Sequence, residues 1–261
     1  GLNLFINSTY NIQEGIKALE QLKKSQNPLI SFGFDFISFC AVSDSQIELI
    51  NEYYIESFAD YNKLKEEYAN KPTTHPDLNY RIQYIDSIAM AKNLALEAGT
   101  IKTKEFEELE KSIPYDLLAN EYRAGNYTKV IYKALKQRER VHEQFYNEYA
   151  LMSLHAIFQQ VYNEAFPLRY PTDNSEYCHF YFYLQFALTE NEIAPIIEST
   201  LSYFNPEELY DKSYFYYCAI KDLEAKILVK EQGLTYTQQW FTKYLDRFNN
   251  GYYKSVAIAR Q

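Results

Sequence analysis

Two Glu-x-x-His pairs are the sharpest chemical signal in the chain: Glu139 with His142, and Glu176 with His179. At this spacing both side chains of a pair share one face of a helix. Carboxylate-bridged di-iron bundles use two such pairs and one more glutamate from each of two other helices. Here only one loop separates the two predicted helices that carry the pairs, no further helix between them supplies the required extra carboxylate, and Glu176 lies at or before its helix start. We therefore expect no metal and no other cofactor.

Other catalytic motifs do not occur in the sequence. GxGxxG, GxxxxGK[ST] and GxSxG are missing, and His142-Glu143 is not continued to the second histidine of a zinc protease. A Ser-His-Asp triad assembles in space, so a helical hydrolase stays open as an alternative. Cys40, Cys178 and Cys218 lie far apart in apolar or aromatic runs. We interpret them as buried free thiols of a protein in a reducing compartment.

A basic strip stands out in this acidic chain. Its members are Lys129, Lys133, Lys136, Arg138 and Arg140. One interpretation is a solvated helix face. The functional interpretation is a contact patch for an acidic partner or a peptide carboxylate, so these five residues are the candidate partner-binding residues.

The composition indicates which elements must position these groups. Of 261 residues, 47% are apolar and 17% aromatic, but only 7 are glycine. Tight β-turns and phosphate-binding loops both need glycine, so its scarcity favours helices joined by short polar loops. We predict an all-α protein of antiparallel helix pairs, packed as a superhelix or a multi-helix bundle. We expect a single domain over 1–261, with the proline-containing segment 167–176 as the candidate point of subdivision.

The net charge of -9 argues against a nucleic-acid partner, which needs a basic face. The longest apolar stretch near the start, Leu29 to Val42, is too short and too polar to span a bilayer. No secretory signal is visible. We therefore expect a cytoplasmic protein without a membrane partner.

Apolar periodicity and turn residues predict the helix positions. The clearest stripe recurs every three or four residues from Ile47 to Tyr68, behind a capping box of Ser45 and Glu48. Thr189 and Glu192 form a second capping box, and Asn205-Pro206 predicts another helix start. The expected helices lie at about 10–24, 29–42, 45–68, 77–99, 104–111, from Pro114 to the Gly125-Asn126 turn, 127–166 with a break near Gln137, 177–188, 189–204, 205–232 and 237–249. The tail at 252–258 is the doubtful segment.

The segment 117–135 reads LLANEYRAGNYTKVIYKAL. Its centre, Tyr122 to Tyr127, resembles the inter-helix turn of a tetratricopeptide repeat, where Gly-Asp/Asn-Tyr joins two antiparallel helices. The match covers one repeat of about 20 residues, and departs from the pattern at Leu118 and Val130, where small residues are expected. The resemblance implies tetratricopeptide-like superhelical packing. The overall profile also resembles all-α immunity proteins of bacterial polymorphic toxin systems, and the peptide-sensing helical-repeat domain of quorum-sensing regulators.

These resemblances imply a non-catalytic protein-binding function. The favoured hypothesis is an immunity protein that neutralises a cognate toxin, with acidic residues steering a basic partner. The 27 tyrosines agree with it, because tyrosine beyond what a core absorbs is typical of interfaces. A peptide-sensing regulatory domain is the alternative, and a helical hydrolase or di-metal enzyme is a further one.

Overall fold

The computed structural model describes residues 35–69, 82–85, 87, 104–137, 143–168, 176–232, 236 and 239–261. Within these ranges every regular element is helical and none is a strand, which confirms the all-α prediction. In chain order the named elements are α3 (Phe36–Phe39), α4 (Asp44–Ala69), α6 (Lys104–Arg123), α7 (Tyr127–Gln137), α8 (Glu143–Tyr162), α9 (Glu176–Glu190), α10 (Ile193–Ser202), the 3₁₀ turn η1 (Pro206–Glu208), α11 (Asp211–Gln232), α12 (Trp240–Arg247) and α13 (Lys254–Ala259).

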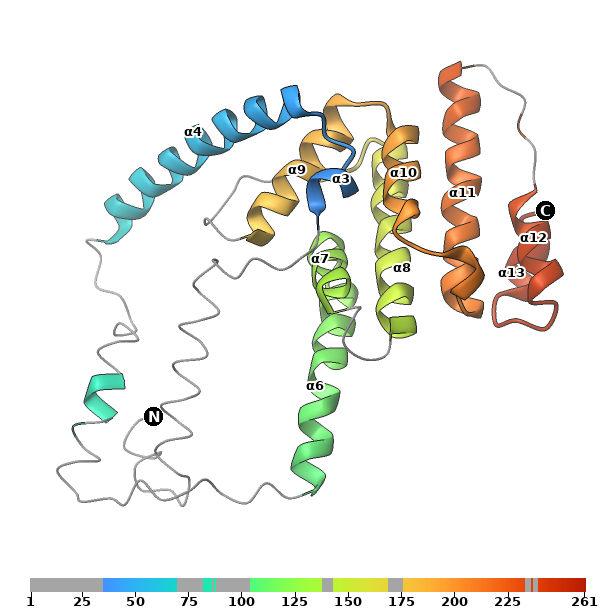
Figure 1. Cartoon of the computed structure of the whole chain (residues 1–261), viewed down its shortest axis with the longest axis horizontal. Coiled ribbons are helices and arrows are strands. Elements are labelled where there is room, and N and C mark those ends of the chain that lie inside the picture. Colours follow the sequence, from blue (N-terminus) through green and yellow to red (C-terminus); the bar gives the residue numbers. More distant parts are fainter. Residues whose placement is uncertain are drawn as a thin grey trace.

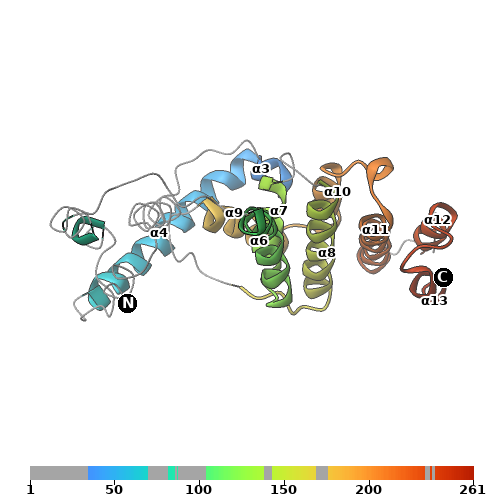
Figure 2. The ribbon, with the colours of Figure 1, turned by 90° about the horizontal axis from the view of Figure 1, so that it is seen from below.

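The helices form an open array in which most elements pack against their neighbours in the chain (Figure 1). α8 is central, because it packs against α7 on one side and α11 on the other. α12 covers the far side of α11 and carries α13, and α10 contacts α3, α9 and α11. Figure 1 shows α10 and α11 running in opposite directions. α4 contacts α9 and lies at the opposite end of the array from α12 and α13 (Figure 2).

One hydrophobic core extends from α3 to α11. Its largest fully buried side chains include Phe39, Ile50, Leu118, Ile131, Leu151, Leu154, Ile157, Phe158, Phe180 and Leu184. Aromatic rings from distant segments meet edge to face, as Phe36 does with Tyr183 at 5.4 Å between ring centroids. Such pairs add about 0.5–1.5 kcal/mol to the burial of their area. The aromatic helix expected over 177–188 is α9, and its burial confirms that it is central in the core.

A second, smaller cluster joins α11, α12 and α13. Its buried members are Phe215, Cys218, Ala219, Phe241, Tyr244 and Ala257. Phe215 stacks on Tyr253 with centroids 4.2 Å apart, and the Tyr244 hydroxyl donates a hydrogen bond to Asp211. Trp240, the only tryptophan of the chain, packs at the edge of this cluster with the Lys243 ammonium 3.9 Å from its ring centroid. The tail that the sequence left doubtful thus includes a short helix, α13, that closes this cluster.

Proline 114 does not start a helix, contrary to the sequence prediction. α6 is continuous from Lys104 to Arg123 with Pro114 inside it. Proline removes one backbone hydrogen bond and crowds the preceding turn. Packing just after it compensates, since the Tyr115 ring lies 4.8 Å from that of Phe145 and Leu118 is fully buried. Tertiary contacts therefore override the local break signal here.

Helix starts also differ from two of the predicted caps. α4 begins at Asp44, and its box is formed by Ser43 and Gln46, because the Ser43 N–H donates to Gln46 Oε1 at 3.0 Å. At the second site, Glu192 precedes α10 without any side-chain cap, and the Thr189 hydroxyl instead bonds back to the Gln185 carbonyl at 3.0 Å. The predicted box of Thr189 and Glu192 is therefore wrong.

Other boundaries follow the turn residues more closely. Gly125 adopts a φ of 75°, a left-handed conformation that ends α6 as the sequence predicts. α7 ends at Gln137, where a break was expected, although α8 stops at Tyr162, before Phe166. Asn205 caps only the short turn η1, so α11 starts at Asp211 and not at the proline.

The helix predicted over 29–42 ends earlier in the structure than expected. α3 ends at Phe39, and Ala41 has a φ of 54° that no α-helix continues. The Asp35 carboxylate caps this short helix by accepting from the Ile37 and Ser38 N–H groups, each at 3.1 Å. The predicted helix at 10–24 lies outside the described residues. Of the predicted helix at 77–99, the structure describes only residues 82–85 and 87, which are helical.

Candidate functional site

The lysines of the predicted basic strip are engaged inside the molecule. Lys129 and Lys133 both pair with Glu121 of α6, at 2.6 and 3.2 Å. Lys136 pairs with Glu176 at the start of α9, at 2.9 Å. Arg138 and Arg140 lie outside the described residues. The strip remains a predicted contact surface, but its lysines also fasten α7 to its neighbours.

Glu121 is the acceptor at the centre of this arrangement. Partial burial favours its neutral form, but hydrogen bonds from Lys129, Asn126 and Lys133 outweigh this and lower its pKa to about 2. Its carboxylate is therefore ionised at neutral pH. Two ammonium groups meet one carboxylate here, which leaves one positive charge beside the start of α7.

The two side chains of the second Glu-x-x-His pair contact different partners. Glu176 is engaged with Lys136, while the His179 ring lies 4.1 Å from the Tyr54 ring of α4. No group of three or more His, Cys, Asp or Glu side chains within the described ranges is placed to hold a metal ion. Glu139 and His142 lie outside those ranges.

The three cysteines are free and buried, as predicted. Burial raises the pKa of the Cys40 thiol far above its usual range, and raises that of Cys218 to about 12. Both therefore stay protonated at neutral pH, and a thiol in that form is a poor nucleophile. They pack as small apolar groups and carry no sign of thiol chemistry.

The inner face of α4 shows how this helix is held. Ile50 and Tyr54 are buried, and the Tyr54 ring meets Phe182 of α9 edge to face at 5.4 Å. The Tyr183 hydroxyl donates to Asn51 Oδ1 at 2.8 Å. Gln46 Nε2 donates to Asn191 Oδ1 at 2.6 Å, just beyond the end of α9. These contacts fix the first half of α4 against α9.

The outer face of the same segment carries an acidic ladder, defined here as Asp44, Glu48, Glu52 and Glu56. All four are exposed and stand four residues apart, and no lysine or arginine occurs between residues 44 and 56. None of the four forms an ion pair with any described residue. Like charges at this spacing destabilise a helix by about 0.2–0.5 kcal/mol per pair. The acidic ladder therefore lowers the stability of α4 itself.

Large apolar side chains are exposed beside the acidic ladder. Leu49, Tyr53 and Ile55 are 59%, 51% and 66% exposed. Tyr53 is held in place by stacking on Phe182, with centroids 5.5 Å apart and an interplanar angle of 22°. We call the acidic ladder and these three residues together the α4 face. On the helix, Leu49 and Tyr53 flank the acidic ladder on one side and Ile55 flanks it on the other, and exposed apolar side chains of this size are typical of a protein-binding surface.

Sequence reasoning identified the buried stripe of α4 but missed the α4 face. The signal was present, because acidic residues recur at every fourth position from 44 to 56. This spacing alone does not predict a binding surface, because a charged helix face usually only contacts solvent. Only the structure shows that Leu49 and Ile55, which flank the ladder, are both left exposed.

Comparisons with known proteins provide no relative. No protein-family model, no curated protein and no solved structure matches the chain. No helix in the described part is long and apolar enough to cross a membrane.

Proposed function

We propose that the protein is a non-catalytic binding protein whose α4 face binds a basic protein partner. The observation that carries this proposal is the exposed acidic ladder, which has no counterion among the described residues, next to exposed Leu49, Tyr53 and Ile55. Apolar side chains of this size supply affinity when buried, while the carboxylates attract a basic surface and speed association. Lysine-rich and arginine-rich partners are therefore the chemical class that fits.

The dimensions of α4 suit this role. Its 26 residues span about 39 Å, long enough to cover one side of a standard protein interface. The specific form of the proposal is an immunity protein that neutralises a basic toxin by covering its active surface. Steered association is valuable for such a protein, because a toxin must be captured before it acts.

The experiment uses the purified full chain as bait in a lysate of its native organism, followed by binding kinetics with the protein it retains. We expect a stoichiometric basic partner. Glu48→Lys with Glu52→Lys should reduce its association rate about tenfold at low salt. Leu49→Ser with Ile55→Ser should instead raise the dissociation rate. The matched control, Glu198→Lys with Glu207→Lys, makes the same change of net charge at exposed glutamates of α10 and η1.

The immunity hypothesis needs a further readout. Expression of the partner alone should arrest growth, and co-expression with the wild-type chain should restore it. The α4 variants should restore growth poorly, while the control pair should restore it fully. An acidic partner, or a basic one indifferent to both α4 variants, would refute the proposal.

A further inference from the structure

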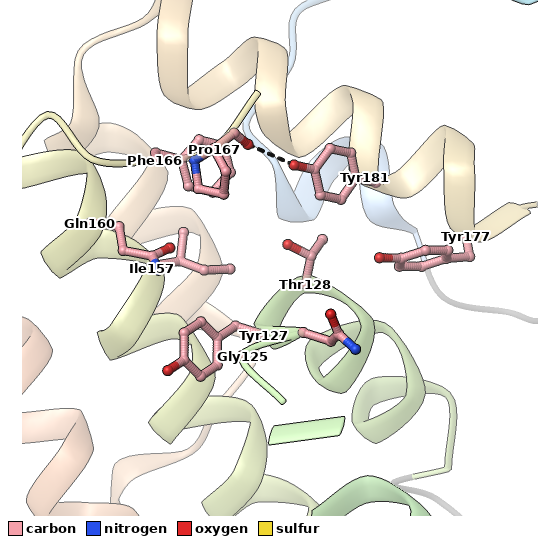
Figure 3. Close-up of a pocket in the computed structure, with 10 residues that line it drawn as sticks. Gly125, Tyr127, Thr128, Ile157, Gln160, Phe166, Pro167, Tyr177 and Tyr181 are labelled. Atoms are coloured by element: carbon pink, nitrogen blue, oxygen red, sulfur yellow. Dashed lines mark hydrogen bonds between the residues drawn. The ribbon is translucent and has the colours of Figure 1, made fainter. Parts of the chain in front are cut away.

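A hollow lies at the start of α7 and shares no residue with the α4 face. Its walls come from the Gly125–Thr128 turn, from α8 and the segment after it, and from α9, as Figure 3 shows. The Tyr181 hydroxyl donates to the Pro167 carbonyl at 2.8 Å, which ties α9 to the segment after α8 across the hollow. The cavity volume is about 20 Å³, room for one group the size of a water molecule. A metabolite-sized ligand needs several hundred Å³, so this hollow suits the tip of a larger molecule.

Thr128 marks the centre of this hollow. Its side chain rises from the first turn of α7 into the space between Ile157 and Tyr177 (Figure 3). The residue is only 6% exposed, yet its hydroxyl has no hydrogen-bond partner among the described residues. The hydroxyl faces the hollow and is therefore available to donate a hydrogen bond to a ligand atom there.

The helix start supplies further donors beside Thr128. The first backbone hydrogen bond of α7 runs from the Val130 N–H to the Asn126 carbonyl, at 3.1 Å. The three preceding N–H groups, of residues 127–129, have no acceptor within the described structure. The Asn126 Nδ2 group donates to Glu121 Oε2 at 2.8 Å, and within the described structure no N–H of residues 127–129 donates to Asn126 Oδ1. N–H groups free at a helix start are natural donors to an anion.

The local charge has the matching sign. Of the three lysines of α7, Lys129 and Lys133 share Glu121 and Lys136 pairs with Glu176, which leaves one positive charge near the start of the helix. None of the side chains that line the hollow is acidic or basic, and the Gln160 amide offers one more donor on the wall opposite Thr128. The remaining walls are apolar or aromatic, from Ile157, Phe166 and Tyr177. An anion with an apolar neighbour fits this combination.

We propose that the hollow binds a peptide carboxylate. One carboxylate oxygen accepts from the Thr128 hydroxyl and from the N–H groups at the start of α7, and the adjoining apolar part of the peptide packs on the aromatic wall. A carboxylate is favoured over a phosphate, because the ion pairs of α7 leave a single positive charge, which matches a monoanion better than a phosphate group of higher charge. The site is independent of the α4 face, so either proposal stands without the other.

The test is a titration of the isotope-labelled full chain, followed by the backbone amide NMR signals of residues 125–129. The probes are acetyl-Ala-Ala-Leu with a free C-terminus, the same peptide as its C-terminal amide, and acetyl-Ala-Glu-Ala amide. We expect saturable shifts with the free C-terminus and none with the first amide. Shifts with the glutamate peptide would support the site and assign it to acidic side chains; their absence assigns it to chain ends.

Variants separate the hydroxyl from the shape of the hollow. Thr128→Val keeps the volume and should weaken binding about tenfold or more, whereas Thr128→Ser should bind within about threefold of wild type. Thr189→Val is the matched control, because that hydroxyl already bonds to its own helix. Gln160→Ala is a second probe of the same site should Thr128→Val fold poorly. Equal shifts with the free and amidated peptides, or no shift with any probe, would overturn the proposal.

Discussion

α4 and α8 are both long helices, yet the array uses them in opposite ways. α8 lies between α7 and α11, and its buried side chains extend from Tyr146 to Phe158. Among residues 44–56 of α4, only Ile50 and Tyr54 are buried, and the other side shows apolar and acidic groups to solvent. The comparison teaches that α8 is buried between its neighbours, while α4 is held by one face and leaves exposed the face that we propose for a partner.

The largest effect should come from the same substitution made on both helices. Leu154→Ala on α8 removes a fully buried side chain and should lower the free energy of unfolding by about 2–5 kcal/mol. Leu49→Ala on α4 removes a 59% exposed one and should change it by less than about 0.5 kcal/mol. Urea unfolding followed by far-UV circular dichroism measures both. Equal losses would break the contrast between the two helices.

A second effect concerns a histidine inside α8. Burial, followed by the charge of Arg260, lowers the pKa of His155 from 6.5 to about 4, although Asp222 acts in the other direction. Its Nε2 atom is buried without a partner among the described residues. Between those two pH values the unfolded chain binds a proton that the folded chain does not. The contribution of neutral His155 to the free energy of unfolding is therefore complete above about pH 6.5. It decreases as the pH falls toward 4, by at most about 3 kcal/mol.

The measurement is the free energy of unfolding at several pH values for wild type and His155→Phe. The variant should lose this part of the pH dependence, while carboxylate titrations common to both proteins remain. Leu49→Ala serves as the control and should keep the wild-type slope. Parallel curves for wild type and His155→Phe would show that His155 is not held neutral by the fold.

The smallest effect tests how α4 is fastened. Tyr183→Phe deletes the hydrogen bond to Asn51 and should cost about 1 kcal/mol. Asn51→Ala should cost a similar amount, and the double variant little more than either single change, because both remove one interaction. Additive losses in urea unfolding would mean that the two side chains contribute separately.

Local signals in the sequence predicted much of the helix layout. Gly125 ends α6 because only a residue tolerant of positive φ suits that turn, and the aromatic residues of α9 had to be buried. The errors arise where contacts distant in sequence decide. Pro114 stays inside α6 because of packing against α8, and Thr189 prefers a carbonyl of its own helix to a cap.

The candidate sites were harder to predict for the same reason. The lysines of α7 have no acidic neighbour within their own helix, but they form ion pairs with Glu121 of α6 and Glu176 of α9. The spacing of the α4 carboxylates can be read from the sequence. Whether they belong to a binding surface depends on the exposure of Leu49 and Ile55, which only the packing of α4 decides. The hollow at Thr128 is formed by three segments that are distant in the sequence, so no local sequence pattern predicts it.

The position of Trp240 makes the two hydrophobic clusters separately observable. The single indole sits on α12 beside the α11–α13 cluster, so its emission reports on that end of the array alone. Circular dichroism reports on all helices at once. If the two signals change together on unfolding, the clusters form one cooperative unit; if emission changes first, the C-terminal end is a separate foldon that opens while α7, α8 and α9 remain folded.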